Sequence, residues 1–188
     1  IRAMLARNSL APATVCEVGC GAGQILRILS ERMPAAEHFY GYEISPQAYE
    51  LCSPLANERL SFKLLDLLEQ EDVFDLVMAI DVFEHVEDYI GFIRSLRERG
   101  RHQLFHIPLD LSVQSVLRGT PMRSRAEIGH LHYYYKDTAL ATLTSAGCEI
   151  VDWCYTASDL ELPNRGWKAN LAKLPRKVLY GLHQDFAA

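Results

Sequence analysis

The sequence lacks the features that mark several classes of protein. Its longest apolar runs fall far short of the roughly 20 residues that a membrane span needs, so we expect no membrane segment. The first ten residues show no basic start followed by an apolar stretch, so we expect no signal peptide and a cytoplasmic location. The net charge of -5 offers no basic surface for nucleic acid, which we exclude as a partner.

Cysteine is too sparse and too irregularly spaced to form a structural framework. The five cysteines are odd in number and include no C-x-x-C pair, which argues against disulfides and against a zinc cluster. Reduced thiols suit a cytoplasmic protein. Three cysteines lie in apolar, strand-like runs, where we expect small core residues: Cys16, Cys148 and Cys154.

Strand and helix patterns alternate along the chain, which predicts a single domain over residues 1–188. Short apolar runs predict strands at 14–18, 38–44, 60–65, 74–80, 103–107 and 148–155. Helical spacing predicts helices at 24–33, from 46 onward, and at 88–99, 136–146 and 167–182. Repeated strand–helix units predict an α/β fold, a doubly wound, Rossmann-like and mostly parallel sheet with helices on both faces. Such sheets bind ligands beyond the carboxyl ends of their strands.

One long segment, 109–132, shows no clear periodicity. Segments of this length without regular structure are uncommon in compact domains unless they are functional or disordered. We interpret it as a lid or insertion on the acceptor side of a binding site. Its arginines at 118, 123 and 125 could hold an acidic acceptor, and a plain solvated loop is the alternative.

A glycine loop follows the first predicted strand and precedes a helix. Gly19, Gly21 and Gly23 alternate with other residues, and glycine tolerates positive φ and close approach of a ligand to the backbone. The free N–H groups at the start of the helix can hold an anionic group. The pattern is G-x-G-x-G with Glu17 before it, whereas the dinucleotide fingerprint is G-x-G-x-x-G. A plain tight turn is the alternative.

The order of motifs resembles the class I S-adenosylmethionine-dependent methyltransferases, in particular those that act on small molecules. The segments that carry the resemblance cover nearly the whole chain: Val15–Gly23, Gly41–Ser45, Leu64–Leu67, Phe74–Val86, Gly129–Tyr134 and Gly147–Ile150. The resemblance implies S-adenosylmethionine as cofactor and methyl transfer to a small-molecule acceptor. It does not name the methylated atom, which could be oxygen, nitrogen or carbon.

The resemblance assigns a role to the acidic residues at the strand ends. Glu17 would lie near the cofactor's amino group, Glu43 would bind the ribose hydroxyls, and Asp66 would contact adenine. Asp81 would lie under the methionine portion. A surface carboxylate for Glu43 and a helix cap for Asp66 are the alternatives. The full cofactor set that we expect is Glu17, Gly19, Cys20, Gly21, Gly23, Glu43, Ile44, Asp66, Leu67, Asp81 and Val82.

Two histidines are candidate catalytic residues. His85 follows Asp81 by four residues, and an imidazole can accept a proton at neutral pH, so His85 could serve as a general base. A packing or capping role is the alternative. His130 lies in the segment near the acceptor in the resemblance, and is the second catalytic candidate. His130 and His132 are two potential metal ligands without a clear third, so we expect no metal site.

One departure from the family concerns the end of the sheet. The family adds a seventh, antiparallel strand after its last helix, and we expect this strand to be missing before Ala188. The exposed edge of the sixth predicted strand could pair with another chain, so we consider a homodimer. Two other functions stay open: a non-catalytic S-adenosylmethionine-binding or assembly subunit, and an NAD-dependent oxidoreductase.

Overall fold

The computed structural model describes residues 1–156, which fold around a five-stranded parallel sheet. The strands are β1 (Thr14–Val18), β2 (His38–Glu43), β3 (Leu60–Leu64), β4 (Phe74–Ile80) and β5 (Gly100–His106). Their order in the sheet is β3-β2-β1-β4-β5, so the direction of winding reverses between β1 and β4. A parallel, doubly wound sheet opens a ligand crevice at this switch point, beyond the carboxyl ends of the strands.

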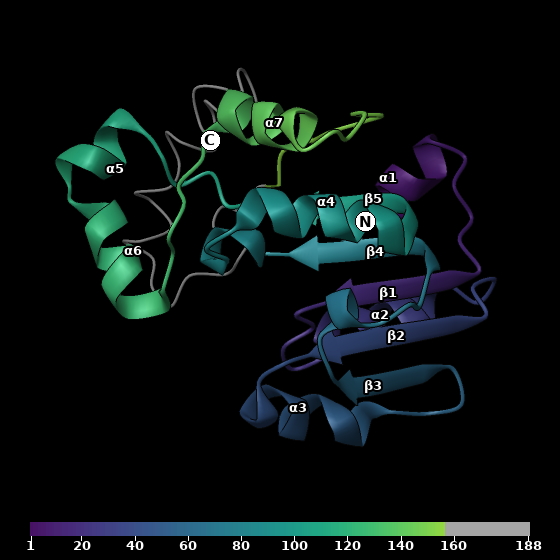
Figure 1. Ribbon diagram of the computed structural model, residues 1–188. Coiled ribbons are helices and arrows are strands. Elements are labelled where there is room, and N and C mark those ends of the chain that lie inside the picture. The colour runs from purple at the N-terminus through teal and green to yellow at the C-terminus, as the bar shows by residue number, and fades with distance from the viewer. Residues whose placement is uncertain (157–188) are drawn as a thin grey trace, which may run out of the picture.

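Helices cover both faces of the sheet (Figure 1). The α-helices are α1 (Arg2–Arg7), α2 (Gln24–Arg32), α3 (Pro46–Cys52), α4 (Tyr89–Arg99), α5 (Val113–Leu117), α6 (Thr120–Ile128) and α7 (Lys136–Ser145). Three 3-10 turns are η1 (Ser53–Leu55), η2 (Leu67–Glu69) and η3 (Phe83–His85). The predicted α/β, Rossmann-like fold is thus confirmed.

Two apolar cores form because successive strand residues point to opposite faces. Along β4, Val77 and Ala79 belong to one core, and Leu76 and Met78 belong to the other. The first core packs against α4 and α7, and the second against α1, α2 and α3. Cys16 is fully buried in the first core, as expected.

Local sequence signals explain where several helices begin. The hydroxyl of Ser45 accepts a hydrogen bond from the N–H of Ala48, and Pro46 occupies the first helical position of α3. Asp88 caps α4 in the same way through the N–H of Gly91. These predicted helix starts are confirmed.

The predicted sixth strand is wrong. Residues 148–156 carry no strand, and no ladder joins them to β5. The apolar run suggested a buried strand, but Val151 is 71% exposed and Cys154 is also exposed, so Cys154 is not a core residue. Asp152 instead accepts hydrogen bonds from Arg7 and Asn8, which hold this segment to the end of α1. The predicted helix at 167–182 lies outside the described residues, as does any seventh strand.

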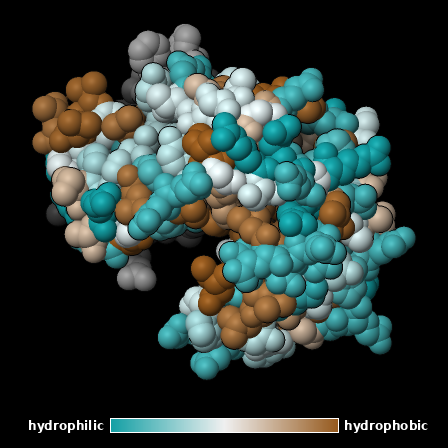
Figure 2. Space-filling view, viewed as in Figure 1, coloured by the Kyte–Doolittle hydropathy of each residue, from teal (hydrophilic) through white to brown (hydrophobic). Residues whose placement is uncertain are grey.

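The segment 109–132 contains two helices that the sequence did not predict. In Figure 1, α5 and α6 stand apart from the sheet, on the side to which the strand arrows point. Figure 2 shows a hollow between this pair and the part of the molecule built on β2, β3 and α3. Several apolar side chains of the pair are exposed: Val113, Val116, Leu117, Met122 and Ile128. The insertion therefore overhangs the edge of the sheet where a ligand is expected.

Candidate functional site

The glycine loop between β1 and α2 is held by the neighbouring strand. The N–H groups of Gly19 and Cys20 both donate to the carbonyl of Tyr42, at 2.8 and 3.1 Å. All three glycines have positive φ, at +65°, +53° and +71°. A side chain on Gly21 would meet nothing within 4 Å, so this part of the backbone is open to a ligand.

Glu43 ties the loop to the end of β2. Its carboxylate accepts hydrogen bonds from the N–H groups of Gly21 and Ser45, both at 2.8 Å. The residue is only 7% exposed, which contradicts the alternative of an exposed surface carboxylate. An ionised carboxylate has about four acceptor sites, so lone pairs remain for a ligand.

Glu17 is a buried acid with one carboxyl oxygen that has no partner among residues 1–156. It lies in β1 with 2% of its surface exposed, and its Oε2 has no hydrogen bond. Burial raises the pKa of Glu17 to about 8. A buried orphan carboxyl group beside a glycine loop fits a ligand that brings a cationic donor, such as an amino group.

The remaining cofactor candidates divide into accessible and inaccessible side chains. Ile44 is 71% exposed at the end of β2. Asp66 Oδ1 accepts a hydrogen bond from the N–H of Leu68, so Asp66 acts as a helix cap, as the alternative interpretation expected. The other carboxylate oxygen, Oδ2, does not take part in this bond. The side chains of Cys20 and Leu67 are buried in the two cores, so only their backbone atoms could face a ligand.

Asp81 and Val82 follow β4 at the switch point. Asp81 has a φ of +52°, which is uncommon outside glycine and places strain at this position. Val82 lies against the glycine loop, since a Cβ on Gly19 would meet its Cγ2 at 3.0 Å. The Asp81 carboxylate also pairs with His106 Nδ1 at 2.6 Å, and this hydrogen bond raises the pKa of His106. Sequence reasoning missed His106, because only the pairing of β4 with β5 brings it beside Asp81.

The two candidate catalytic histidines lie next to each other in the folded chain. The ring centroids of His85 and His130 lie 4.8 Å apart. Glu84 lies beneath them with no exposed surface, and its Oε1 is 3.9 Å from His85 Nε2. Within the part of the chain that the structure describes, neither carboxylate oxygen of Glu84 has a hydrogen-bond partner, and burial raises the pKa of Glu84 to about 7. The sequence analysis did not single out Glu84.

Backbone hydrogen bonds join the two segments that carry this cluster. The N–H groups of Leu131 and His132 both donate to the carbonyl of Glu84, at 2.8 and 3.2 Å. His130 Nδ1 pairs with Asp110 Oδ2 at 2.9 Å. His132 points elsewhere, because its Nε2 bonds to the carbonyl of Val86 at 2.9 Å. His130 and His132 lie two residues apart in the sequence, but their rings bond to different partners.

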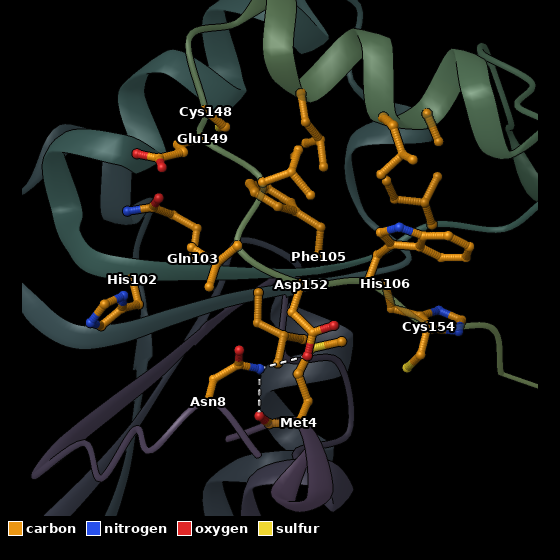
Figure 3. A pocket seen from close by; sticks show the side chains of 18 of the residues that line it. Met4, Asn8, His102, Gln103, Phe105, His106, Cys148, Glu149, Asp152 and Cys154 are labelled. Atoms are coloured by element: carbon orange, nitrogen blue, oxygen red, sulfur yellow. Dashed lines mark hydrogen bonds between the residues drawn. The ribbon is translucent and has the colours of Figure 1, made fainter. Parts of the chain in front are cut away.

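A cavity with a volume of about 1050 Å³ lies beside β5. It is bounded by β5, α7, the end of α1 and residues 147–156. Figure 3 shows Asp152 turned toward Asn8, and Phe105 pointing from β5 toward α7. One end of the cavity reaches Asp81 and Asp110, so it adjoins the site without containing the glycine loop.

Comparison with protein families assigns the domain. A family model described as "Methyltransferase domain" matches residues 1–152. The chain belongs to this family, which confirms the class of enzyme expected from the motifs: a class I S-adenosylmethionine-dependent methyltransferase. No curated protein matches the chain.

Solved structures confirm the fold. Magnesium protoporphyrin IX methyltransferase from Synechocystis PCC 6803, with bound S-adenosylhomocysteine, has a TM-score of 0.60 and 20% identity, over 77% of this chain and 68% of that one. A protein from Bacillus halodurans C-125 described as a methyltransferase has a TM-score of 0.60 and 13% identity, over 77% and 67% of the two chains. The methyltransferase domain of a bacterial Hen1 has a TM-score of 0.59 and 17% identity, over 77% and 80%.

Other matches are partial. The chain spans 37% of the plantazolicin methyltransferase BpumL in one complex and 39% in another. Their TM-scores are 0.44 and 0.46. These similarities cover too little of either chain to support an argument about the activity of the present protein.

Proposed function

We propose that this domain transfers a methyl group from S-adenosylmethionine to a small-molecule acceptor. The observation that carries the proposal is the joint geometry of the glycine loop with Glu17 and Glu43. Glu43 lies against the loop and retains free lone pairs for ribose hydroxyls. Glu17 offers an unpaired carboxyl oxygen for the cofactor's amino group. When bound, the cofactor supplies an electrophilic methyl group on a sulfonium.

The contributions of the chain would be alignment and exclusion of water. Methyl transfer is an in-line displacement, and positioning alone can lower such barriers by roughly 7–11 kcal/mol. His85 and His130 would position the acceptor and remove its proton where the acceptor atom carries one. The insertion 109–132 would cover the acceptor, since α5 and α6 overhang the carboxyl edge of the sheet (Figure 1).

Several finer expectations stay predictions. A small-molecule acceptor is consistent with the neighbour that methylates magnesium protoporphyrin IX, and with the net charge of -5. None of the described helices is long and apolar enough to cross a bilayer, and a cytoplasmic location stays a prediction. A homodimer also stays a prediction, and light scattering of the purified chain would measure its mass.

Calorimetric titration of the full chain with S-adenosylmethionine, S-adenosylhomocysteine and NAD tests the cofactor. We expect saturable binding of the first two and none of NAD, since the loop lacks the dinucleotide spacing. Preference for NAD would overturn the proposal in favour of an oxidoreductase. Tight cofactor binding without turnover over a broad acceptor panel would instead favour a non-catalytic subunit.

A further inference from the structure

We propose that Glu84, His85 and His130 form a binding site for one divalent transition-metal ion. The ligand atoms of these three side chains all lie within 4.8 Å of one another. This site departs from the sequence expectation of no metal, which considered His130 with His132. The sequence did not indicate this group of ligands, because His130 lies 45 residues beyond His85 and meets it only in the folded chain.

Glu84 is the strongest single indication of a bound cation. Both of its carboxylate oxygens are inaccessible and have no hydrogen-bond partner in the described part of the chain. A buried carboxyl group without partners costs free energy, whereas a cation at the same place would satisfy it. The side chain is aimed at the two imidazoles, with Oε1 3.9 Å from His85 Nε2.

Asp110 supplies the outer partner that metal-binding histidines usually have. A ligating histidine commonly donates its other ring N–H to a carboxylate, which fixes the tautomer and the orientation of the ring. His130 Nδ1 pairs with Asp110 Oδ2 at 2.9 Å, which leaves His130 Nε2 for the metal. The backbone bonds from Leu131 and His132 to Glu84 fix the two segments relative to each other.

The donor set selects the kind of ion. Two imidazoles and one carboxylate suit Zn²⁺ and other first-row divalent ions, whereas Mg²⁺ and Ca²⁺ prefer oxygen ligands throughout. Ligand atoms bonded to one ion at about 2.0–2.2 Å lie roughly 3–4 Å apart, so a modest rotation of the exposed His85 side chain closes the site. Three protein ligands leave a position open.

That open position suggests the class of acceptor. The cluster follows β4 directly, and Val82 of the same segment touches the glycine loop. An acceptor held through an oxygen atom, such as a hydroxyl or carboxylate, could therefore reach both the ion and the methyl donor. With the ion bound, the ion itself and not a free imidazole of His85 or His130 would position the acceptor. This last step rests on the proposed function, whereas metal binding itself does not.

Metal titration of the full chain tests the site. The protein is stripped with a chelator, exchanged into metal-free buffer, and titrated calorimetrically with Zn²⁺ and with Mn²⁺, which binds thiols poorly. We expect one site per chain, with affinity at least tenfold lower in Glu84→Gln and His85→Asn. Asp110→Asn should weaken binding by about 10–100-fold, as the loss of an outer partner typically does. His102→Ala, which removes a histidine of β5 outside the cluster, should bind normally.

Thermal unfolding separates binding from folding. Mn²⁺ should raise the melting temperature of the wild type and of His102→Ala, and leave that of Glu84→Gln unchanged, provided that all three melt cooperatively without metal. Absence of binding in the wild type, or equal affinity in Glu84→Gln, would overturn the proposal. S-adenosylhomocysteine titrated into the stripped protein tests the cofactor site by itself, so either proposal can fail while the other holds.

Discussion

At the residue scale, two buried carboxyl groups lie on either side of the switch point between β1 and β4. Glu17 and Glu84 each carry unpaired oxygens, and burial raises the pKa of both groups. Such groups cost stability unless something pairs with them. We infer that Glu17 lies on the cofactor side of the site and Glu84 on the acceptor side. Each residue lowers the stability of the empty chain, and a bound ligand would offset this cost.

Glu17→Gln should make stability less dependent on pH. The pKa of Glu17 is about 8 in the folded chain and near 4.5 when unfolded, so the unfolded state loses its proton first as the pH rises. The free energy of unfolding therefore falls between pH 4.5 and 8, by at most on the order of 5 kcal/mol at 1.36 kcal/mol per unit. The glutamine variant lacks this loss, so its free energy of unfolding should match that of the wild type near pH 4 and exceed it at pH 8.

Urea unfolding of the cofactor-free chain at several pH values measures this difference. Glu58→Gln, which changes an exposed carboxylate, is the matched control and should follow the wild-type curve. Equal stability of Glu17→Gln and the wild type at pH 8 would show that the carboxyl group is not held neutral by burial.

At the element scale, the contact of α2 with the sheet depends on a glycine. Gly23 precedes α2 with a φ of +71°, and a Cβ there would meet the Phe62 ring at 2.7 Å and Cys52 Cβ at 2.8 Å. Gly21 also has positive φ, at +53°, but a Cβ there meets nothing within 4 Å. The two positions share the backbone strain and differ in packing.

Gly23→Ala should therefore destabilise the chain more than Gly21→Ala. A non-glycine residue with a left-handed backbone conformation costs roughly 1–2 kcal/mol of stability, and overpacking adds about 1–3 kcal/mol. We expect a loss of about 1–2 kcal/mol for Gly21→Ala and about 2–5 kcal/mol for Gly23→Ala in denaturant unfolding. Equal losses would mean that Phe62 and Cys52 can move aside.

The same scale shows which elements the sequence could predict. The strand at 74–80 and the cap at Ser45 were predictable because their signals are local, in composition and in spacing. The apolar run at 148–155 wrongly predicted a strand, because an apolar segment becomes a strand only where the edge of a neighbouring strand pairs with it. Here Asp152 pairs with the end of α1 instead.

At the scale of the whole molecule, the site joins segments that are distant in sequence. The glycine loop and the acidic strand ends were predictable because parallel strands bring their carboxyl ends to one edge. The roles of Glu84, His106 and Asp110 were not, since each depends on a partner at least 20 residues away or on burial. Family motifs indicate the proposed cofactor side, whereas the proposed acceptor side could be recognised only in the folded chain.

S-adenosylhomocysteine should stabilise the whole molecule by binding at the edge of the sheet where the carboxyl ends of the strands meet. A ligand at 100 times its dissociation constant adds about 2.7 kcal/mol, which raises the melting temperature of a chain of this size by about 5–10 °C. Glu43→Ala removes charge-assisted bonds worth roughly 1.5–3 kcal/mol each, so the shift at the same ligand concentration should fall below half.

Scanning fluorimetry or calorimetry with and without ligand measures the shift. Because Glu43 also holds the N–H groups of Gly21 and Ser45, its loss could lower stability without ligand. The comparison therefore uses the ligand-induced shift in melting temperature within each variant. The matched control is Glu50→Ala, which removes an exposed carboxylate of α3. A full shift in Glu43→Ala would remove Glu43 from the cofactor site, and a lost shift in Glu50→Ala would point to a general effect of surface charge. A full shift in the control and a reduced one in Glu43→Ala would link the end of β2 to the ligand, because both variants lose one carboxylate and only Glu43 lies against the glycine loop.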